Sequence, residues 1–157
     1  MVKLNVTLKN GKYTVTDSKD RLIYNVKTGM GGKTHLLDAS GYKLFHFVPE
    51  KKSKKPAFMV YRDSKEVFSA VCTSMFLEPS FALQGEFRGE KIDFNVVSED
   101  RREFKIMRGD KQVGSVSSEE DKKEMKYSIE TEEKYFDDYI PLIAVFIDMA
   151  FAKINKG

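Results

Sequence analysis

One stretch near the end of the chain decides the fold: residues 140–152 read Ile-Pro-Leu-Ile-Ala-Val-Phe-Ile-Asp-Met-Ala-Phe-Ala. A helix formed by these residues is apolar on every face except at Asp148, so every face must be buried. Pro141 suits the first helical turn, and Asp137 or Asp138 suits the cap before it. We therefore predict a buried C-terminal helix over about residues 138–154.

The length of this helix argues against a membrane span. Thirteen residues rise only about 20 Å, and a span needs roughly 20 apolar residues. Asp148 also lies inside the stretch. A helix enclosed by sheet is the preferred interpretation, with a tail anchor and an interface helix as alternatives. A buried carboxylate needs a partner, so we expect Asp148 to bond to barrel backbone or to a basic strand residue and to fix the helix register.

Upstream of the helix, short runs rich in Val, Ile, Tyr and Phe alternate with polar turns, which is typical of β-hairpins. Twelve such runs occur, at residues 4–8, 13–15, 22–26, 36–37, 44–48, 58–61, 67–71, 81–87, 92–97, 104–107, 113–116 and 125–131. A barrel this wide leaves a lumen that a helix about 10 Å across can fill, and closure removes the sheet edges. We predict one mainly β domain over residues 1–157, a closed antiparallel barrel around the helix. A two-sheet sandwich is the alternative.

The order of these hairpins carries a resemblance to a known family. The runs at 13–24, 37–45, 59–67 and 104–114 each place a polar turn between strands, and 142–148 follows as an apolar helix with a late Asp. This order resembles the LURP-one-related family, which belongs with the tubby C-terminal domain and the phospholipid scramblases. The resemblance covers nearly the whole chain, although each hairpin alone is generic.

The resemblance implies a tubby-like barrel of twelve strands around a central C-terminal helix. It also implies binding of phosphoinositides or other anionic lipids at a basic barrel surface, as in some relatives. The chain lacks the acidic calcium-binding segment that scramblases carry beside the helix, and its single cysteine offers no cluster for palmitoylation. Scramblase activity is therefore not expected.

Basic residues concentrate in the first third of the chain. Residues 1–56 hold 12 basic and 4 acidic residues, against 15 and 20 in residues 57–157. Four lysines stand between Pro49 and Pro56, and because proline cannot donate to a ladder, we expect the loop to stay outside both neighbouring strands. The predicted ligand contacts are Lys51, Lys52, Lys54 and Lys55. A solvated charge run that aids solubility is the alternative.

Three motifs that suggest chemistry do not meet its requirements. Residues 28–34 resemble a phosphate-binding loop, but such a loop needs glycine where Lys27 stands and a helix immediately afterwards. His35 and His46 fall on different predicted strands without metal-ligand spacing. Cys72 lies in an apolar strand and is expected to be a buried small hydrophobe rather than a reactive thiol. We therefore expect no enzyme activity, no metal and no cofactor.

The leading functional prediction is a non-enzymatic module that binds anionic phospholipid headgroups at a basic surface. A protein-interaction or scaffolding domain without a small ligand is the second hypothesis, and an unrecognised hydrolase or transferase the third. Nucleic acid is not expected as a partner, because no aromatic residue stands among the lysines to stack on bases. The lone cysteine and the absence of a signal-peptide hydrophobic region predict a cytoplasmic protein, peripheral to a membrane if lipid is the ligand and without a transmembrane segment.

Overall fold

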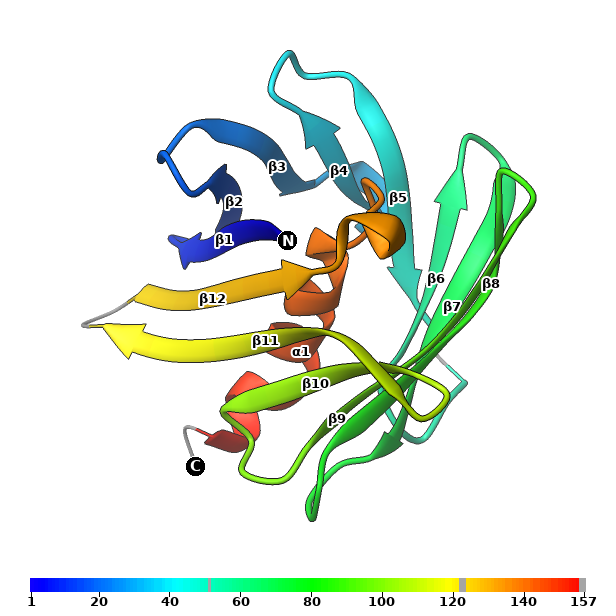
Figure 1. The fold of residues 1–157 in the computed structure, drawn as a ribbon. Coiled ribbons are helices and arrows are strands. Elements are labelled where there is room, and N and C mark those ends of the chain that lie inside the picture. The colour runs from blue at the N-terminus through cyan, green and yellow to red at the C-terminus, as the bar shows by residue number, and fades with distance from the viewer. Residues whose placement is uncertain (51, 122–123, 156–157) are drawn as a thin grey trace.

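The computed structural model describes residues 1–50, 52–121 and 124–155, and within them twelve strands form one closed antiparallel barrel (Figure 1). The strands are β1 (Val2–Lys9), β2 (Lys12–Asp17), β3 (Leu22–Thr28), β4 (Thr34–Asp38), β5 (Lys43–Pro49), β6 (Ala57–Arg62), β7 (Lys65–Ser74), β8 (Ser80–Phe87), β9 (Glu90–Ser98), β10 (Glu103–Arg108), β11 (Lys111–Asp121) and β12 (Glu124–Thr131). Each strand pairs with its neighbours in the sequence, and β1 pairs with β12 to close the ring. The predicted fold class is confirmed, and the sandwich alternative is wrong.

Two short 3-10 turns and one long helix complete the described chain. They are η1 (Met30–Gly32), η2 (Glu133–Tyr135) and α1 (Pro141–Asn155). The helix begins three residues later than expected. The carboxylates expected to cap it have other partners: Asp138 accepts a 2.5 Å hydrogen bond from the Tyr24 hydroxyl, and Asp137 accepts one from the Asp138 N–H. Tyr24 therefore ties the start of the helix to β3.

Because every hairpin reverses the chain, the connections fall alternately at the two ends of the barrel. The end where α1 begins is called the helix-N rim here, and it carries connections 17–22, 38–43, 62–65, 87–90 and 108–111. The opposite end is called the helix-C rim, and it carries connections 9–12, 28–34, 49–57, 74–80 and 98–103.

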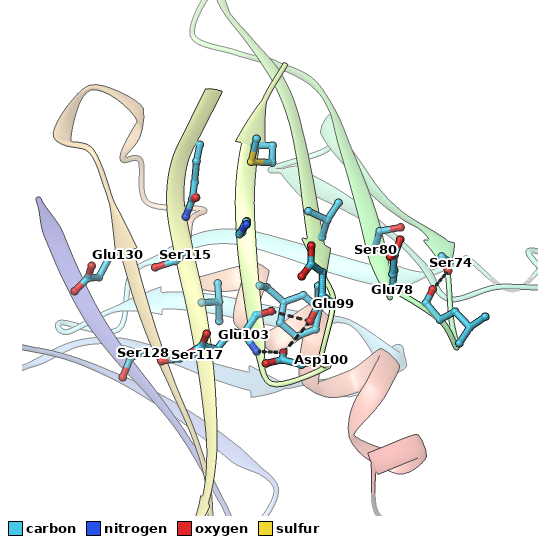
Figure 2. Close-up of a pocket in the computed structure, with 18 residues that line it drawn as sticks. Ser74, Glu78, Ser80, Glu99, Asp100, Glu103, Ser115, Ser117, Ser128 and Glu130 are labelled. Atoms are coloured by element: carbon cyan, nitrogen blue, oxygen red, sulfur yellow. Dashed lines mark hydrogen bonds between the residues drawn. The ribbon is translucent and has the colours of Figure 1, made fainter. Parts of the chain in front are cut away.

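Alternation along each strand separates a polar outer face from an apolar interior, as the period of two requires. On β11 and β12 the outer face presents Ser115, Ser117 and Ser128 (Figure 2). The residues between them, Val116 and Ile129, are buried and directly opposite each other.

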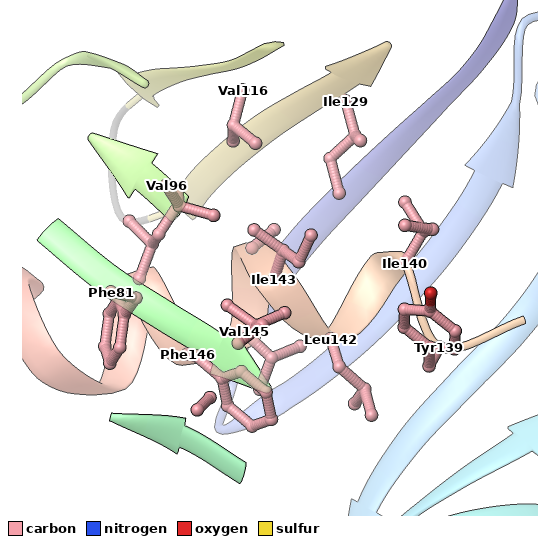
Figure 3. Packing of buried hydrophobic residues seen from close by; sticks show 14 of the residues in the cluster. Phe81, Val96, Val116, Ile129, Tyr139, Ile140, Leu142, Ile143, Val145 and Phe146 are labelled. Carbon is pink, nitrogen blue, oxygen red and sulfur yellow. The ribbon is translucent and has the colours of Figure 1, made fainter. Parts of the chain in front are cut away.

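The interior is filled by α1 (Figure 3). Phe146 is 1% exposed, stacks on Phe58 at a ring-centroid distance of 4.6 Å and meets Phe47 edge-on at 5.0 Å. Near the end of the helix, Phe151 packs on Phe81 and Phe104. Full burial of one such side chain contributes about 1.5–3 kcal/mol, so the helix and the barrel stabilise each other strongly. The predicted buried helix is confirmed.

Asp148 is the buried charge in this apolar core, at 5% exposure. The hydroxyls of Tyr13 and Tyr127 each donate to one of its carboxylate oxygens at 2.6 Å. Burial, with Asp148 alongside, raises the pKa of both tyrosines, so both stay protonated as donors. The expectation of a backbone or basic partner is wrong, because two neutral hydroxyls from β2 and β12 satisfy the carboxylate without bringing a second charge into the core.

Candidate functional site

The lysine-rich connection between β5 and β6 lies on the helix-C rim. Lys52, Lys54 and Lys55 are exposed, and Lys51 lies outside the described residues. The Lys55 ammonium group donates a 3.0 Å hydrogen bond to the carbonyl of Thr73 on β7. The structure therefore brings three of the predicted contact residues to one end of the barrel and ties them to the neighbouring β7–β8 hairpin.

The loop lies outside both neighbouring strands, as expected, because β5 ends at Pro49 and β6 begins at Ala57, but both of its ends are still bonded to the sheet. Pro49 lies opposite Phe58, and the next N–H, that of Glu50, donates to the carbonyl of Ala57 at 2.8 Å. The carbonyl of Pro56 accepts from the N–H of Cys72 at 2.9 Å. Proline lacks only the N–H, so its carbonyl and its neighbours still join the ladder. The lysines consequently sit on a short loop held at both ends.

The β7–β8 hairpin lies next to the lysine loop and exposes two large apolar side chains at its tip. Phe76 is 69% exposed and Leu77 is 85% exposed. Strands β7 and β8 stay paired as far as Ser74 opposite Ser80. Strands β6 and β7 stop pairing earlier on β7, at Ala57 opposite Val71. Phe76 and Leu77 therefore stand at the helix-C rim beyond the end of the β7–β8 ladder, next to the loop that Lys55 joins to Thr73.

Internal hydrogen bonds hold this tip in place. The guanidinium of Arg101, on the β9–β10 connection, donates from Nη2 to the Phe76 carbonyl at 2.5 Å and to the Met75 carbonyl at 3.1 Å. Its Nε also donates to the Phe76 carbonyl at 3.1 Å. The Ser74 hydroxyl donates to the Leu77 carbonyl at 2.7 Å. Three consecutive carbonyls of the tip are thus satisfied within the protein.

Sequence reasoning missed this tip. The signal was present, because Met75, Phe76 and Leu77 stand where a turn is expected and turns favour Gly, Pro, Asn, Asp and Ser. The partner that fixes the tip was not visible, since Arg101 is 25 residues from Phe76 in the chain.

A groove of about 890 Å³ crosses the outer face of β8–β12 and begins at this same hairpin (Figure 2). Leu77 and Glu78 line one end, and carboxylates and serines line the floor. The groove carboxylates are Glu78, Glu99, Asp100, Glu103 and Glu130. Asp100 is occupied by its own turn, where it accepts from the N–H groups of Arg102 and Glu103, and these bonds lower its pKa. The hairpin tip thus separates a lysine loop from an acidic groove.

The remaining candidate residues lie in ordinary strand positions. Cys72 is 2% exposed, as expected, and burial raises the pKa of its thiol. His35 and His46 face each other across β4 and β5 with ring centroids 5.7 Å apart, and His46 stacks on Tyr61. Burial lowers the pKa of both histidines. Across the described part of the chain, no three His, Cys, Asp or Glu side chains gather as a metal site.

The glycine-rich connection 28–34 also lies on the helix-C rim. Residues 30–32 form the η1 turn, and the N–H of Gly29 donates to the carbonyl of Lys33 at 2.7 Å. Thr34 opens strand β4 rather than a helix. Taking only what the structure describes, no helix is both long and apolar enough to cross a membrane.

These features define a closed β-barrel with a central helix and a polar outer surface. The family model described as LURP-one-related matches residues 1–147, which is most of the chain, so the chain belongs to the LURP-one-related family. An X-ray structure of a protein from Arabidopsis thaliana shares the fold with a TM-score of 0.61. The two are 17% identical, and the match covers 98% of this chain and 91% of the other. None of the curated proteins matches this chain.

Proposed function

We propose that this protein is a non-enzymatic module that binds anionic phospholipid membranes through its helix-C rim. One observation carries the proposal: the exposed Lys52, Lys54 and Lys55 lie on the loop next to the hairpin that exposes Phe76 and Leu77, and Lys55 joins the two by its bond to Thr73. Large apolar side chains in water are unfavourable, and next to cations they are typical of membrane-contacting surfaces. In this proposal the protein is cytoplasmic and attaches to the membrane peripherally.

The expected strength of this contact follows from simple electrostatics. Each lysine near an anionic leaflet contributes about 1 kcal/mol, so the lysine loop supports reversible rather than permanent attachment. The attraction acts over about one Debye length, roughly 10 Å at 0.1 M salt. Binding should therefore weaken steeply as salt is added.

A binding role rather than catalysis is supported by the state of the nucleophile and base candidates. The thiol of Cys72 is buried, and its raised pKa keeps it protonated. His46 on β5 is stacked on Tyr61 of β6, and Tyr61 lies opposite Glu66 of β7, six residues along that strand from Cys72. A thiolate activated by an adjacent histidine requires hydrogen-bond contact between the two.

Flotation on liposomes tests the proposal. The natural chain is expected to float with vesicles of phosphatidylcholine and phosphatidylserine and to stay behind with phosphatidylcholine alone. Changing Lys51, Lys52, Lys54 and Lys55 to serine is expected to abolish flotation. A matched control changes four exposed lysines on the helix-N rim, Lys19, Lys43, Lys65 and Lys91, to serine. This control removes the same charge and should still float.

Two results would refute membrane binding at this rim. One is a natural chain that never floats on anionic vesicles. The other is equal loss of flotation in both quadruple variants, which would mean that net charge matters and location does not.

A protein-interaction domain is the second candidate, and the groove across β8–β12 favours it. Its carboxylates include Glu78, Glu99 and Glu103 beside several serines, against one lining lysine, Lys105, which suits an extended segment rich in lysine and arginine. Fluorescence anisotropy with a labelled Lys/Arg-rich peptide tests this candidate. Binding that Glu103→Lys abolishes would support it, and no binding to the natural chain would exclude such a segment.

A further inference from the structure

We infer that the tip of the β7–β8 hairpin is an apolar anchor that inserts Phe76 and Leu77 into the interfacial layer of the bilayer. This inference rests on the proposed function and adds a second mode of attachment to it. The lysine loop supplies long-range, salt-sensitive attraction, and the hairpin tip supplies short-range, salt-insensitive attachment.

Three carbonyl groups of the tip have partners within the protein before the tip meets a membrane. A carbonyl that enters lipid without a hydrogen-bond donor is costly. The carbonyls of Met75, Phe76 and Leu77 already accept bonds from Arg101 and Ser74. The tip can therefore leave water without losing hydrogen bonds at those three positions, whereas an ordinary exposed turn would leave its carbonyls unsatisfied.

The tip is also held in one position before it meets a membrane. Bonds to a charged donor such as Arg101 are about twice as strong as neutral ones. Phe76 and Leu77 are kept pointing outward instead of folding back over the barrel end, as their exposures of 69% and 85% show. A preordered anchor loses little conformational entropy on insertion.

The flanking charges identify a bilayer as the occupant rather than an apolar pocket of another protein. Lys52, Lys54 and Lys55 are exposed on the neighbouring loop, and Lys55 is bonded to the carbonyl of Thr73, three residues before Phe76, so cations stand next to the tip where they can meet phosphate groups. Glu78 follows Leu77 and lines the acidic groove. Because burying a carboxylate is costly, Glu78 limits insertion to the tip.

A single tryptophan reports insertion directly, because the natural chain has none. The Phe76→Trp variant is expected to give a blue-shifted emission and protection from acrylamide when vesicles of phosphatidylcholine and phosphatidylserine are added. Tyr42→Trp, at a 63% exposed site on the helix-N rim, is the matched control and should show neither change. No emission shift of the Phe76→Trp variant on any vesicle, or an equal shift of the Tyr42→Trp control, overturns the anchor.

Serine substitutions measure the strength of the anchor without disturbing the core, since both side chains are exposed. Phe76→Ser and Leu77→Ser are each expected to weaken vesicle partitioning about tenfold, and the loss should persist at high salt. A variant that carries both Phe76→Ser and Leu77→Ser is expected to lose most flotation. If it floats fully while the variant with four lysines changed to serine does not, the anchor is overturned and the proposed function stands. The Phe76→Trp emission can also shift equally on neutral and anionic vesicles, with or without the lysine changes. That result supports the anchor and refutes the proposed electrostatic function.

Discussion

The two ends of the barrel use the same residue types in opposite ways. At the helix-N rim, cations lie on aromatic rings of the protein itself. The Arg62 guanidinium sits 5.8 Å from the Phe45 ring and 5.4 Å from the Phe87 ring, and Arg108 covers Phe94 and Tyr135 at 5.5 and 5.6 Å. These contacts cover the mouth of the barrel where the helix begins.

At the helix-C rim, lysines and large apolar side chains both face water. Lys52 and Lys54 are exposed, and Phe76 and Leu77 are among the most exposed large side chains described. The contacts of the helix-N rim stabilise the fold, each by about 0.5–2 kcal/mol for a cation–π pair. The exposed side chains of Phe76 and Leu77 at the helix-C rim contribute no comparable stabilisation to the fold. Leu22 and Tyr42 are exposed at the helix-N rim as well, at 43% and 63%, so what distinguishes the helix-C rim is the pair of adjacent residues Phe76 and Leu77 on one hairpin tip.

The most severe way to break this comparison is to remove the helix that connects the two ends. Phe146 lies in the middle of that helix, between Phe58 and Phe47. Phe146→Asp would place a second carboxylate in the core without the hydroxyl donors that Asp148 has, at a cost of several kcal/mol. We expect the variant to be unfolded, as measured by circular dichroism and by recovery in the soluble fraction.

Phe146→Leu is the control, because it stays apolar and leaves only a cavity. It should fold with a reduced melting temperature. A soluble Phe146→Asp variant that melts at the same temperature as the natural chain would contradict the central position of this helix.

Much of this fold could be predicted, because its signals are local. Alternation along each strand marks twelve runs, and each of them falls within an observed strand. A helix that is apolar all round has only one stable location in such a protein, inside the sheet. Those two patterns favour a barrel over a sandwich without knowledge of any tertiary contact, and the pairing of β1 with β12 confirms the closure.

The unpredicted features depend on contacts between distant segments. Asp148 is satisfied by Tyr13, 135 residues away, and by Tyr127, 21 residues away. Nothing local distinguishes these two tyrosines from the others in the chain. Likewise, the sequence around Phe76 indicates only a turn, and the bond from Arg101 that holds its backbone exists only in the folded barrel. Composition alone indicates the lysine loop. That Phe76 and Leu77 lie next to it follows only from the order of the strands in the barrel.

A smaller test compares two of the three tyrosine–aspartate contacts that tie α1 and the residues before it to the barrel. Tyr127→Phe removes one donor from a carboxylate that is 5% exposed and should lower the free energy of unfolding by about 2 kcal/mol. Tyr24→Phe removes the donor to Asp138, which is only partly buried and regains water, so its effect should be smaller. Urea denaturation measures both.

The exposed Tyr42 supplies the control for lost hydroxyl groups in general. Tyr42→Phe should stay within about 0.5 kcal/mol of the natural chain, as surface changes usually do. An effect of Tyr127→Phe as small as that of Tyr42→Phe would mean that Asp148 does not depend on the hydroxyl, and the comparison between the two contacts would fail.

The last prediction expects no effect, and it concerns ATP binding at the glycine-rich connection of the helix-C rim. The connection 28–34 contains Gly31, Gly32 and Lys33, which together resemble part of a phosphate-binding loop. A true phosphate loop presents free N–H groups and the positive end of a helix to its ligand. Here the Gly29 N–H is already bonded to the Lys33 carbonyl, and strand β4 follows. We therefore expect isothermal titration with ATP to give no micromolar binding.

Inorganic triphosphate separates nucleotide recognition from plain attraction between lysines and phosphates. Both ligands should give the same weak, salt-sensitive signal or none, and Lys33→Ala should leave the result for ATP unchanged. Micromolar binding of ATP that Lys33→Ala abolishes, with no matching response to triphosphate, would show a nucleotide site at this rim. Exposed cations there would then serve a small ligand, and the contrast between the two ends of the barrel would no longer point to a membrane.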